Sequence, residues 1–368
     1  MSMSLAPAEV GAKIAKWYSC IRKRDVEQAK LLKNEIELML DRMKDKDDEK
    51  VISYYQLVNF RHQLLLETIQ KNEVDANQDD LAGIQTLSDY YLNFMYYFMS
   101  GQDEFYLGRY KSAIRLYKVA EQLLESVPDE SERAEFYHRL GIGYYRIDQY
   151  TFAVSYLEQA LEFFAKRSEY EERALNTKLI LAAISTELTR YDEAEFIYQE
   201  ILKGAQDKYP VTHALILRSL GLNRVRQNRL EEAKMFLMDA LYISEHSESV
   251  VGSKTKYNLA NILLRLDNSV HSRTLLDEAE KEVKRLRLTD YIAKCKISRG
   301  LYIKHDPALV EEGIQELKAG EYYFDCSEVA EEIANYYDNK GDSQNALKYM
   351  RLALQMRINQ SCVGVDQE

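Results

Sequence analysis

A chain of 368 residues is long for one compact core, so the sequence predicts either two domains or an open array of repeats. It contains only 4 prolines and 14 glycines, which favours long helices over many short strands and predicts an all-α fold. The net charge of -11, from 49 basic and 60 acidic residues, argues against direct binding of a nucleic acid backbone.

Residues 1–70 predict an amino-terminal three-helix bundle. Apolar side chains recur at helical spacing in three segments, roughly residues 8–23, 25–44 and 48–70. The segments are separated at Arg24-Asp25 and in the charged stretch KDKDDEK. The apolar face of the second segment is expected to consist of Leu31, Ile36, Met39, Leu40 and Met43.

A linker and a linker helix are predicted for residues 71–100. The stretch from Lys71 to Asp80 is polar, and Val74 is its one large apolar residue. The following segment, LAGIQTLSDYYLNFMYYFMSG, predicts the helix that leads into the next part of the chain. A hinge at this linker would let the bundle move against the rest of the chain.

Residues 101–358 repeat a pattern that is typical of tetratricopeptide helix pairs. In such a pair the second helix carries a small residue near its start, where the first helix crosses it closely. This residue recurs about 40 residues apart through most of the array. About seven repeats forming a right-handed superhelix are therefore predicted, followed by a flexible tail at 359–368. The recurring small residues are Ala113, Ala153, Ala194, Ala233, Ser272, Gly313 and Ala346.

Small residues allow the two helices of a pair to approach closely. We expect such crossings at Gly141 with Ala153 and at Gly221 with Ala233. In the last pair, Met350 is expected to be the large buried residue of the second helix. The 28 tyrosines are expected to fill the core first and to form ligand surface second. The concave wall of such an array can hold another polypeptide.

The sequence contains no signal for a membrane segment, a metal site or a cofactor. It lacks an apolar run of about 18 to 20 residues and a leader pattern at its start, so a soluble, unprocessed, cytoplasmic protein is expected. It has no Cys-x-x-Cys pair, no His-Glu-x-x-His and no phosphate-binding glycine loop. We expect free thiols, no metal and no cofactor. The four cysteines are Cys20, Cys295, Cys326 and Cys362.

The predicted order of elements resembles that of the Rap family of bacterial cytoplasmic regulators: a bundle, a linker helix and a repeat domain. The resemblance covers nearly the whole chain. Three segments carry the resemblance: KIAKWYSCIRKRDVEQAKLLKNEIE, SYYQLVNFRHQLLLE and AEEIANYYDNKGDSQNALKYMRLALQMR. The second is the most specific, because generic repeat proteins have no reason to contain it. The resemblance implies quorum sensing: binding of a response regulator, controlled by a short secreted Phr peptide. Some family members dephosphorylate the sporulation phosphorelay regulator, and others sequester competence-type transcription factors from DNA.

The resemblance also places a catalytic position in the bundle. Family phosphatases have a glutamine at the start of the third helix, five residues before a double tyrosine. The double tyrosine of this chain is Tyr54 and Tyr55, so the position of the family glutamine is occupied by Glu49. A neutral carboxamide can orient an attacking water, whereas a carboxylate repels phosphoryl oxygens. We therefore expect sequestration of a competence-type regulator, with phosphatase activity as the alternative. A purely structural interpretation is that Asp47 or Asp48 caps the helix and Glu49 favours its positive end.

Partner binding is further predicted along the third helix, and peptide binding on the first helices of the repeats. The partner-binding candidates are Asp47, Asp48, Tyr55, Phe60 and His62, of which His62 is also interpreted as a structural, hydrogen-bonded residue. Asparagine amides on a concave wall can pair with a peptide main chain, and solvation is the alternative for each. Family members have Asn-Ile-Gly where this chain has Ser219-Leu220-Gly221, so altered peptide sensitivity is expected. The peptide-binding candidates are His138, Arg218, Ser219, Tyr257, Asn258, Asn261, Glu331 and Asn335.

Overall fold

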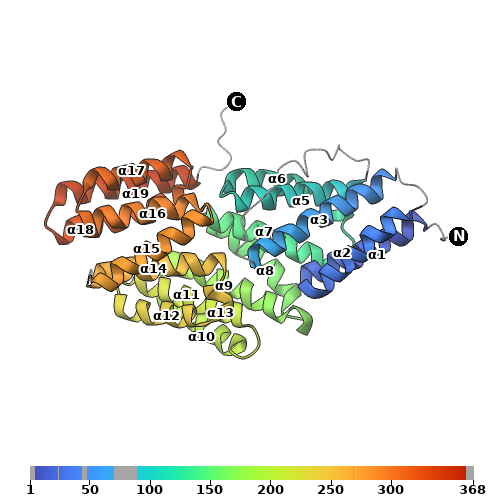
Figure 1. Cartoon of the computed structure of the whole chain (residues 1–368), viewed down its shortest axis with the longest axis horizontal. Coiled ribbons are helices and arrows are strands. Elements are labelled where there is room, and N and C mark those ends of the chain that lie inside the picture. Colours follow the sequence, from blue (N-terminus) through green and yellow to red (C-terminus); the bar gives the residue numbers. More distant parts are fainter. Residues whose placement is uncertain (1–4, 24, 44–47, 70–88, 268, 362–368) are drawn as a thin grey trace. The chain divides into compact units, whose positions relative to one another are not determined.

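The computed structural model describes residues 5–23, 25–43, 48–69, 89–267 and 269–361 (Figure 1). In these ranges the regular secondary structure is helical, and one isolated bridge joins Leu5 to Met43. The all-α prediction is confirmed. The predicted linker at 71–80 lies outside the described residues, as does most of the tail. The chain divides into two compact units, residues 1–140 with 159–171 and residues 141–158 with 172–368.

The first unit begins with the three predicted bundle helices. These are α1 (Pro7–Lys23), α2 (Val26–Asp41) and α3 (Glu49–Ile69). Asp25 caps α2 by accepting a hydrogen bond from the backbone N–H of Gln28. The bundle core consists of side chains that are almost fully buried, among them Ile14, Trp17, Ile36, Leu57 and Val58.

One predicted core residue of α2 is on the surface. Leu31 is 58% exposed, and the buried positions of this helix are Ala29, Leu32 and Ile36. These three follow the spacing of three and four residues that one helix face requires. Leu31 lies off that face, so its assignment to the core was wrong.

The first unit continues with the helices that begin the repeat array. These are α5 (Tyr90–Tyr106), α6 (Tyr110–Gln122), the short η1 (Leu124–Ser126) and the first part of α7 (Glu130–Arg146). Four aromatic rings pack in their core at centroid distances between 5.4 and 6.3 Å. The rings are those of Phe94, Phe98, Tyr117 and Phe136.

The remaining helices belong mostly to the second unit. In chain order these are α8 (Tyr150–Phe164), η2 (Ser168–Tyr170), α9 (Glu171–Glu187), α10 (Tyr191–Ala205), α11 (Pro210–Arg226), α12 (Leu230–Tyr242), α13 (Ser244–Ser247), α14 (Val250–Leu266), α15 (Val270–Arg285), α16 (Thr289–Ser298), the π-helical η3 (Arg299–Lys304), α17 (Pro307–Ala319), α18 (Tyr323–Asn339) and α19 (Ser343–Ser361). The end of α8 and η2 belong to the first unit.

The predicted close crossings are confirmed. A methyl group added at Gly141 would lie 3.2 Å from the carbonyl oxygen of Ala153, and one added at Gly221 would lie 3.2 Å from that of Ala233. Gly101 has the same relation to Ala113 in the first unit. The small residues therefore lie where two helix backbones meet.

In several repeats the turn between the two helices contains a left-handed residue two positions before the second helix. Its φ is 77° at Gly108, 59° at Asp148, 62° at Thr189, 57° at Asn228 and 76° at Gly341. A left-handed residue ends a helix by turning the chain away from the helix axis. The first helices thus end at equivalent positions, which places their last residues in register along the array.

The last pair departs from the prediction. Met350 is 46% exposed, and the neighbouring Tyr349 is buried instead, at 2%. The ring of Tyr349 stacks on that of Tyr337 in α18, with centroids 5.7 Å apart and planes inclined by 1°. This stacking sets the rotation of α19 and turns Met350 outward. None of the helices in the described ranges has the length and apolar character needed to span a bilayer.

Candidate functional site

The start of α3 has the geometry of a capped helix end. The side chain of Asp48 accepts a hydrogen bond from the backbone N–H of Val51 at 3.1 Å, as the structural interpretation predicted. Glu49 follows in the first turn and is exposed. Its carboxylate is accessible to a bound partner, and its catalytic role stays a prediction. Asp47 lies outside the described residues.

The other partner-binding candidates are partly or fully buried in the bundle. Phe60 is 9% exposed, whereas Tyr55 is half-buried and donates a hydrogen bond from its hydroxyl to Glu37 at 2.9 Å. His62 is 2% exposed, and its Nδ1 accepts a hydrogen bond from the indole N–H of Trp17 at 3.2 Å. This geometry assigns the imidazole proton to Nε2.

The environment of His62 keeps its ring neutral. Burial lowers the pKa of His62 from 6.5 to about 4, and the positive charges of Lys33 and Lys30 act in the same direction. A neutral ring can accept the indole proton, whereas an imidazolium cannot. The structural interpretation of His62 therefore has a geometric basis, and a role in partner binding stays a prediction.

Two exposed leucines on α2 were missed as candidates. Leu31 and Leu38 lie seven residues apart and are 58% and 60% exposed. Glu37, the acceptor for Tyr55, precedes Leu38 directly. Large exposed apolar side chains on one helix face are typical of protein interfaces. The burial of Ala29, Leu32 and Ile36 shows that both leucines lie off the core face of α2.

Buried charged groups tie the bundle to the start of α7 within the first unit. The guanidinium of Arg22 in α1 donates to Asp129 at 2.6 Å and to Ser131 at 2.5 Å. Glu132 is 1% exposed and accepts a hydrogen bond from Tyr91 at 2.9 Å. Burial raises the pKa of Glu132, and the nearby charge of Arg22 acts against this rise.

A second buried charge group extends this contact to α3. Arg61 of α3 lies 3.4 Å from Glu135 of α7, and both side chains are 4% exposed. Arg139 donates to the same carboxylate at 3.0 Å. Breaking such a buried pair leaves an uncompensated buried charge. The packing of α3 against α7 therefore depends on these residues.

The peptide-binding candidates divide by exposure. His138 belongs to the first unit, is 4% exposed and packs edge-on against Phe164. Arg218, Ser219 and Asn258 are half-buried, and Asn335 is exposed. Their roles in peptide binding stay predictions.

Tyr257 and Asn261 join α14 to neighbouring helices. The hydroxyl groups of Tyr257 and Ser298 lie 3.1 Å apart, and the amide of Asn261 donates to Ser298 at 3.1 Å. The same amide nitrogen donates to Glu332 of α18 at 2.7 Å, and the hydroxyl of Tyr302 donates to that carboxylate at 2.9 Å. A peptide that uses Asn261 has to exchange these internal hydrogen bonds.

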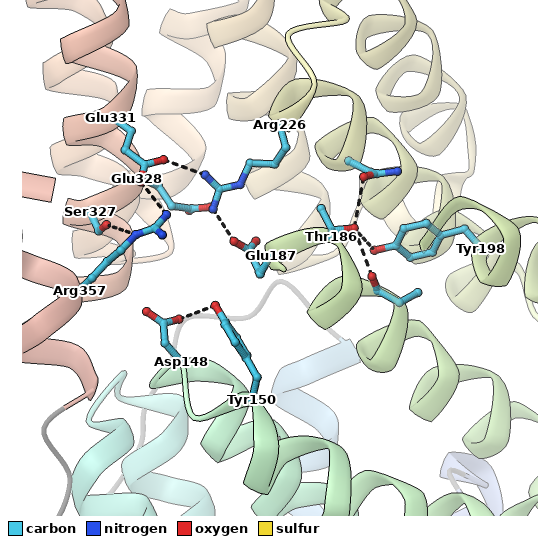
Figure 2. A network of polar contacts seen from close by, with 12 residues as sticks. Asp148, Tyr150, Thr186, Glu187, Tyr198, Arg226, Ser327, Glu328, Glu331 and Arg357 are labelled. Atoms are coloured by element: carbon cyan, nitrogen blue, oxygen red, sulfur yellow. Dashed lines mark hydrogen bonds and ion pairs between the residues drawn. The ribbon is translucent and has the colours of Figure 1, made fainter. Parts of the chain in front are cut away.

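The remaining candidate, Glu331, pairs with a residue that lines an acidic cavity in the second unit, Arg226 (Figure 2). This cavity is partly open to solvent. Its charged and aromatic lining comes from the α7–α8 turn and from α8, α9, α11, α18 and α19. The lining residues are Asp148, Tyr150, Glu187, Arg226, Phe324, Ser327, Glu328 and Arg357.

Burial and carboxylate crowding mark this cavity. Burial raises the pKa of Glu187 to about 7, against the opposing charge of Arg226. Burial also raises the pKa of Asp148, whose carboxylate accepts a 2.9 Å hydrogen bond from the hydroxyl of Tyr150. A site of this kind favours cationic groups, because the carboxylates of Asp148, Glu187 and Glu328 lie around it.

The sequence contained a signal for this cavity. Arg146, Glu187 and Arg226 are the last residues of three successive first helices, α7, α9 and α11. The repeat register places them at equivalent positions, and their charges alternate. The guanidinium of Arg146 lies over the ring of Phe324, at 5.6 Å from its centroid, so this row of charges faces the start of α18.

The fold and these surfaces define a tetratricopeptide-type repeat protein with an amino-terminal helical bundle. Residues 4–67 match the family model described as response regulator aspartate phosphatase H, N terminal. Residues 93–166 and 328–357 match tetratricopeptide repeat models. Response regulator aspartate phosphatase E of Bacillus subtilis is 30% identical over 271 residues, which cover 72% of this chain and 72% of that protein. The chain belongs to the Rap family.

Two further comparisons extend over nearly the whole chain. A solved structure of a Rap protein complexed with competence and sporulation factor has a TM-score of 0.89 at 25% identity, covering 96% of this chain and 99% of that chain. A protein of Rhodococcus hoagii named type II methyltransferase M.CeqI is 49% identical over 372 residues, which cover 100% of this chain and 71% of that protein. That name describes the relative alone.

Proposed function

We propose that this chain is a cytoplasmic Rap-type regulator that binds a bacterial response regulator through its bundle and inhibits it by sequestration. A short Phr-type signalling peptide, bound in the repeat groove, controls this activity. The observation that carries the proposal is the match, at a TM-score of 0.89, to a Rap protein complexed with competence and sporulation factor. The response regulator is of the competence type, which binds DNA.

The exposed surface of the bundle supports partner binding there. Leu38 directly follows Glu37, to which the half-buried Tyr55 of α3 donates a hydrogen bond, and the exposed Leu31 lies two helical turns earlier in α2. Apolar side chains beside a charged rim are typical of sites where proteins recognise one another. A regulator held by this surface is kept from its DNA site.

The position of Glu49 favours sequestration over hydrolysis. A phosphoryl aspartate is surrounded by negative oxygens, so an exposed carboxylate at the start of α3 repels the group that a carboxamide would approach. The alternative function, dephosphorylation of a sporulation phosphorelay regulator, is supported by the match of residues 4–67 to the amino-terminal region of a response regulator aspartate phosphatase.

Incubation with a phosphorylated response regulator separates the two functions. Under sequestration the phosphoryl label stays on the regulator while a stable complex forms and DNA binding is lost. Under phosphatase activity the label disappears faster than in the regulator alone. Glu49→Gln restores the carboxamide, and it is expected to accelerate loss of the label without weakening the complex. Failure to form a complex with a regulator of either type contradicts the sequestration proposal.

Peptide control is expected to act through the shape of the repeat array. A peptide in the groove draws the array into a tighter coil, and the bundle then packs onto the repeats and releases its partner. A ligand can shift such an equilibrium only by its differential affinity for the two arrangements. Small-angle scattering with and without candidate Phr peptides measures the compaction, and an unchanged radius of gyration with a bound peptide contradicts this mechanism.

A further inference from the structure

We propose that Arg226 is an internal clasp, which holds the end of α11 against α9 and α18 without any ligand. The clasp comprises Arg226 together with Glu187, Glu328, Glu331 and Arg357, all in the second unit (Figure 2). It closes the acidic cavity with a cation that the chain itself supplies.

The geometry of Arg226 joins the ends of two consecutive first helices, α9 and α11, to the distant α18. Its Nη2 lies 2.5 Å from Oε2 of Glu187 at the end of α9. Its Nη1 lies 3.1 Å from Oε2 of Glu331 in α18, which is 105 residues further along the chain. Glu328, one helical turn before Glu331, is 3.6 Å away. One guanidinium therefore bridges carboxylates from separate repeats.

Arg357 extends the clasp to α19. Its Nη2 lies 2.6 Å from the second oxygen of Glu331, and its Nε donates to Ser327 at 3.2 Å. Glu331 thus receives a guanidinium on each oxygen. This double pairing fixes the carboxylate that Arg226 contacts.

The charges show why the contact depends on Arg226. Asp148, Glu187, Glu328 and Glu331 bring four carboxylates to the clasp and the adjoining cavity, against the two guanidiniums of Arg226 and Arg357. Without Arg226, Glu187 of α9 and the two glutamates of α18 face one another with like charge. The side chains of Arg226 and Glu187 are 22% and 11% exposed, so water screens this repulsion incompletely.

The side chain of Arg226 also decides what the cavity can accept. Its guanidinium is already paired with the carboxylates that would otherwise bind the cationic group of a ligand. A cationic ligand group therefore has to displace Arg226. Removal of the side chain beyond Cβ should convert the cavity into a site for a free guanidinium ion, since the carboxylates and the space remain.

The test measures the distance between α10 and α18 in the protein without peptide or partner. Spin labels are placed at Asp192→Cys and Asn339→Cys, which are exposed positions. Cys20 and Cys362 are replaced by serine, and the buried Cys295 and Cys326 are kept. Pulsed electron–electron double resonance then gives the distribution of distances between the labels.

Arg226→Ala is expected to give a longer and broader distribution than the parent protein, and to lower the Tm by roughly 5 °C or more. The matched control is Arg299→Ala. Arg299 is 23% exposed and also pairs with two carboxylates, Asp277 and Glu280, but both belong to the neighbouring α15. It should leave the distribution unchanged.

Chemical rescue separates the clasp from a general loss of stability. Millimolar methylguanidinium should return the Arg226→Ala distribution toward that of the parent protein, whereas the neutral methylurea should not. Arg226→Lys keeps the charge without the two-pronged geometry, and should lie between the parent protein and Arg226→Ala. An unchanged distribution in Arg226→Ala, or equal broadening in Arg299→Ala, overturns the proposal whether or not the chain binds a peptide.

Discussion

At the scale of single residues, Thr189 adopts a backbone conformation that is unfavourable for its branched side chain. It has a φ of 62° in the turn between α9 and α10. A β-branched residue in the left-handed region costs of the order of 1–3 kcal/mol, and glycine adopts it without steric penalty. The turn keeps this conformation because it has to end one helix and start the next within a few residues.

Replacing Thr189 by glycine should therefore stabilise the repeats. We expect an increase of about 1 kcal/mol in the free energy of unfolding, measured as a higher urea midpoint with an unchanged m-value. Asn228→Gly is the matched control at a φ of 57°, and it should change stability less because asparagine tolerates this region. A lower midpoint for Thr189→Gly would show that the threonine side chain contributes more than its strain.

His62 should make the bundle sensitive to acid. Its pKa in the folded chain is about 4, below its ordinary value of 6.5, so the unfolded chain binds a proton that the folded chain excludes. The stability contributed by neutral His62 is full above pH 6.5 and is lost as the pH falls toward 4. Between pH 7 and 5 the loss is about 2 kcal/mol.

Trp17 reports this change directly, because it is the single tryptophan of the chain and donates to His62. Its fluorescence follows unfolding of the bundle in urea at pH 7 and at pH 5. His62→Gln keeps an acceptor for the indole but cannot take up a proton. This variant should show a smaller difference between the two pH values, and an equal difference would assign the acid sensitivity to other groups.

At the scale of helices, the sequence predicted most of what the structure contains. The period of small residues located the crossings at Gly141 and Gly221, because a backbone contact leaves no room for a side chain. The rotation of α19 was not predictable in this way. Met350 and Tyr349 are adjacent and both large, and only the ring of Tyr337 on the partner helix decides which of them is buried.

The candidate site was predicted less completely, for a related reason. Glu331 was found by its place on a first helix, whereas Arg226 and Glu187 were not. Local sequence shows which face of a helix is polar, but it does not show which distant helices the superhelix brings together. Asn261 illustrates the same limit, since its amide already donates to Glu332 of α18.

The crossing at Gly221 should be intolerant of a single methyl group. In Gly221→Ala the new Cβ would lie 2.8 Å from Cδ2 of Leu237, and we expect a loss of about 1–3 kcal/mol in the free energy of unfolding. Gly11→Ala is the matched control inside α1, where no atom lies within 4 Å of the added carbon. It should stabilise by roughly 0.5–1 kcal/mol through helix propensity, and a comparable loss in both variants would contradict the packing argument.

At the scale of the whole molecule, the bundle is expected to supply the partner-binding surface. Replacing Leu31 and Leu38 together by serine should weaken the complex with the response regulator by about tenfold or more, measured by surface plasmon resonance. The Tm should stay within a degree or two, because both side chains are largely exposed.

The control for this double variant lies at the other end of the chain. Leu347 and Leu354 of α19 are also seven residues apart and are 52% and 61% exposed. Replacing them by serine should leave regulator binding unchanged. Equal weakening by both double variants would place the partner surface elsewhere or extend it to the repeats.

The pairing of Arg226 with Glu331 also bears on how the repeats unfold. An array whose units contact only their neighbours loses structure gradually from its ends, as a one-dimensional chain of coupled elements. A contact across 105 residues closes a loop in that chain, so that unfolding of α18 directly removes a contact of α11. Unfolding in the second unit should consequently be more cooperative than in a linear solenoid of the same length. Its refolding should be slower, because the entropy of closing a long loop is lost before the contact can form.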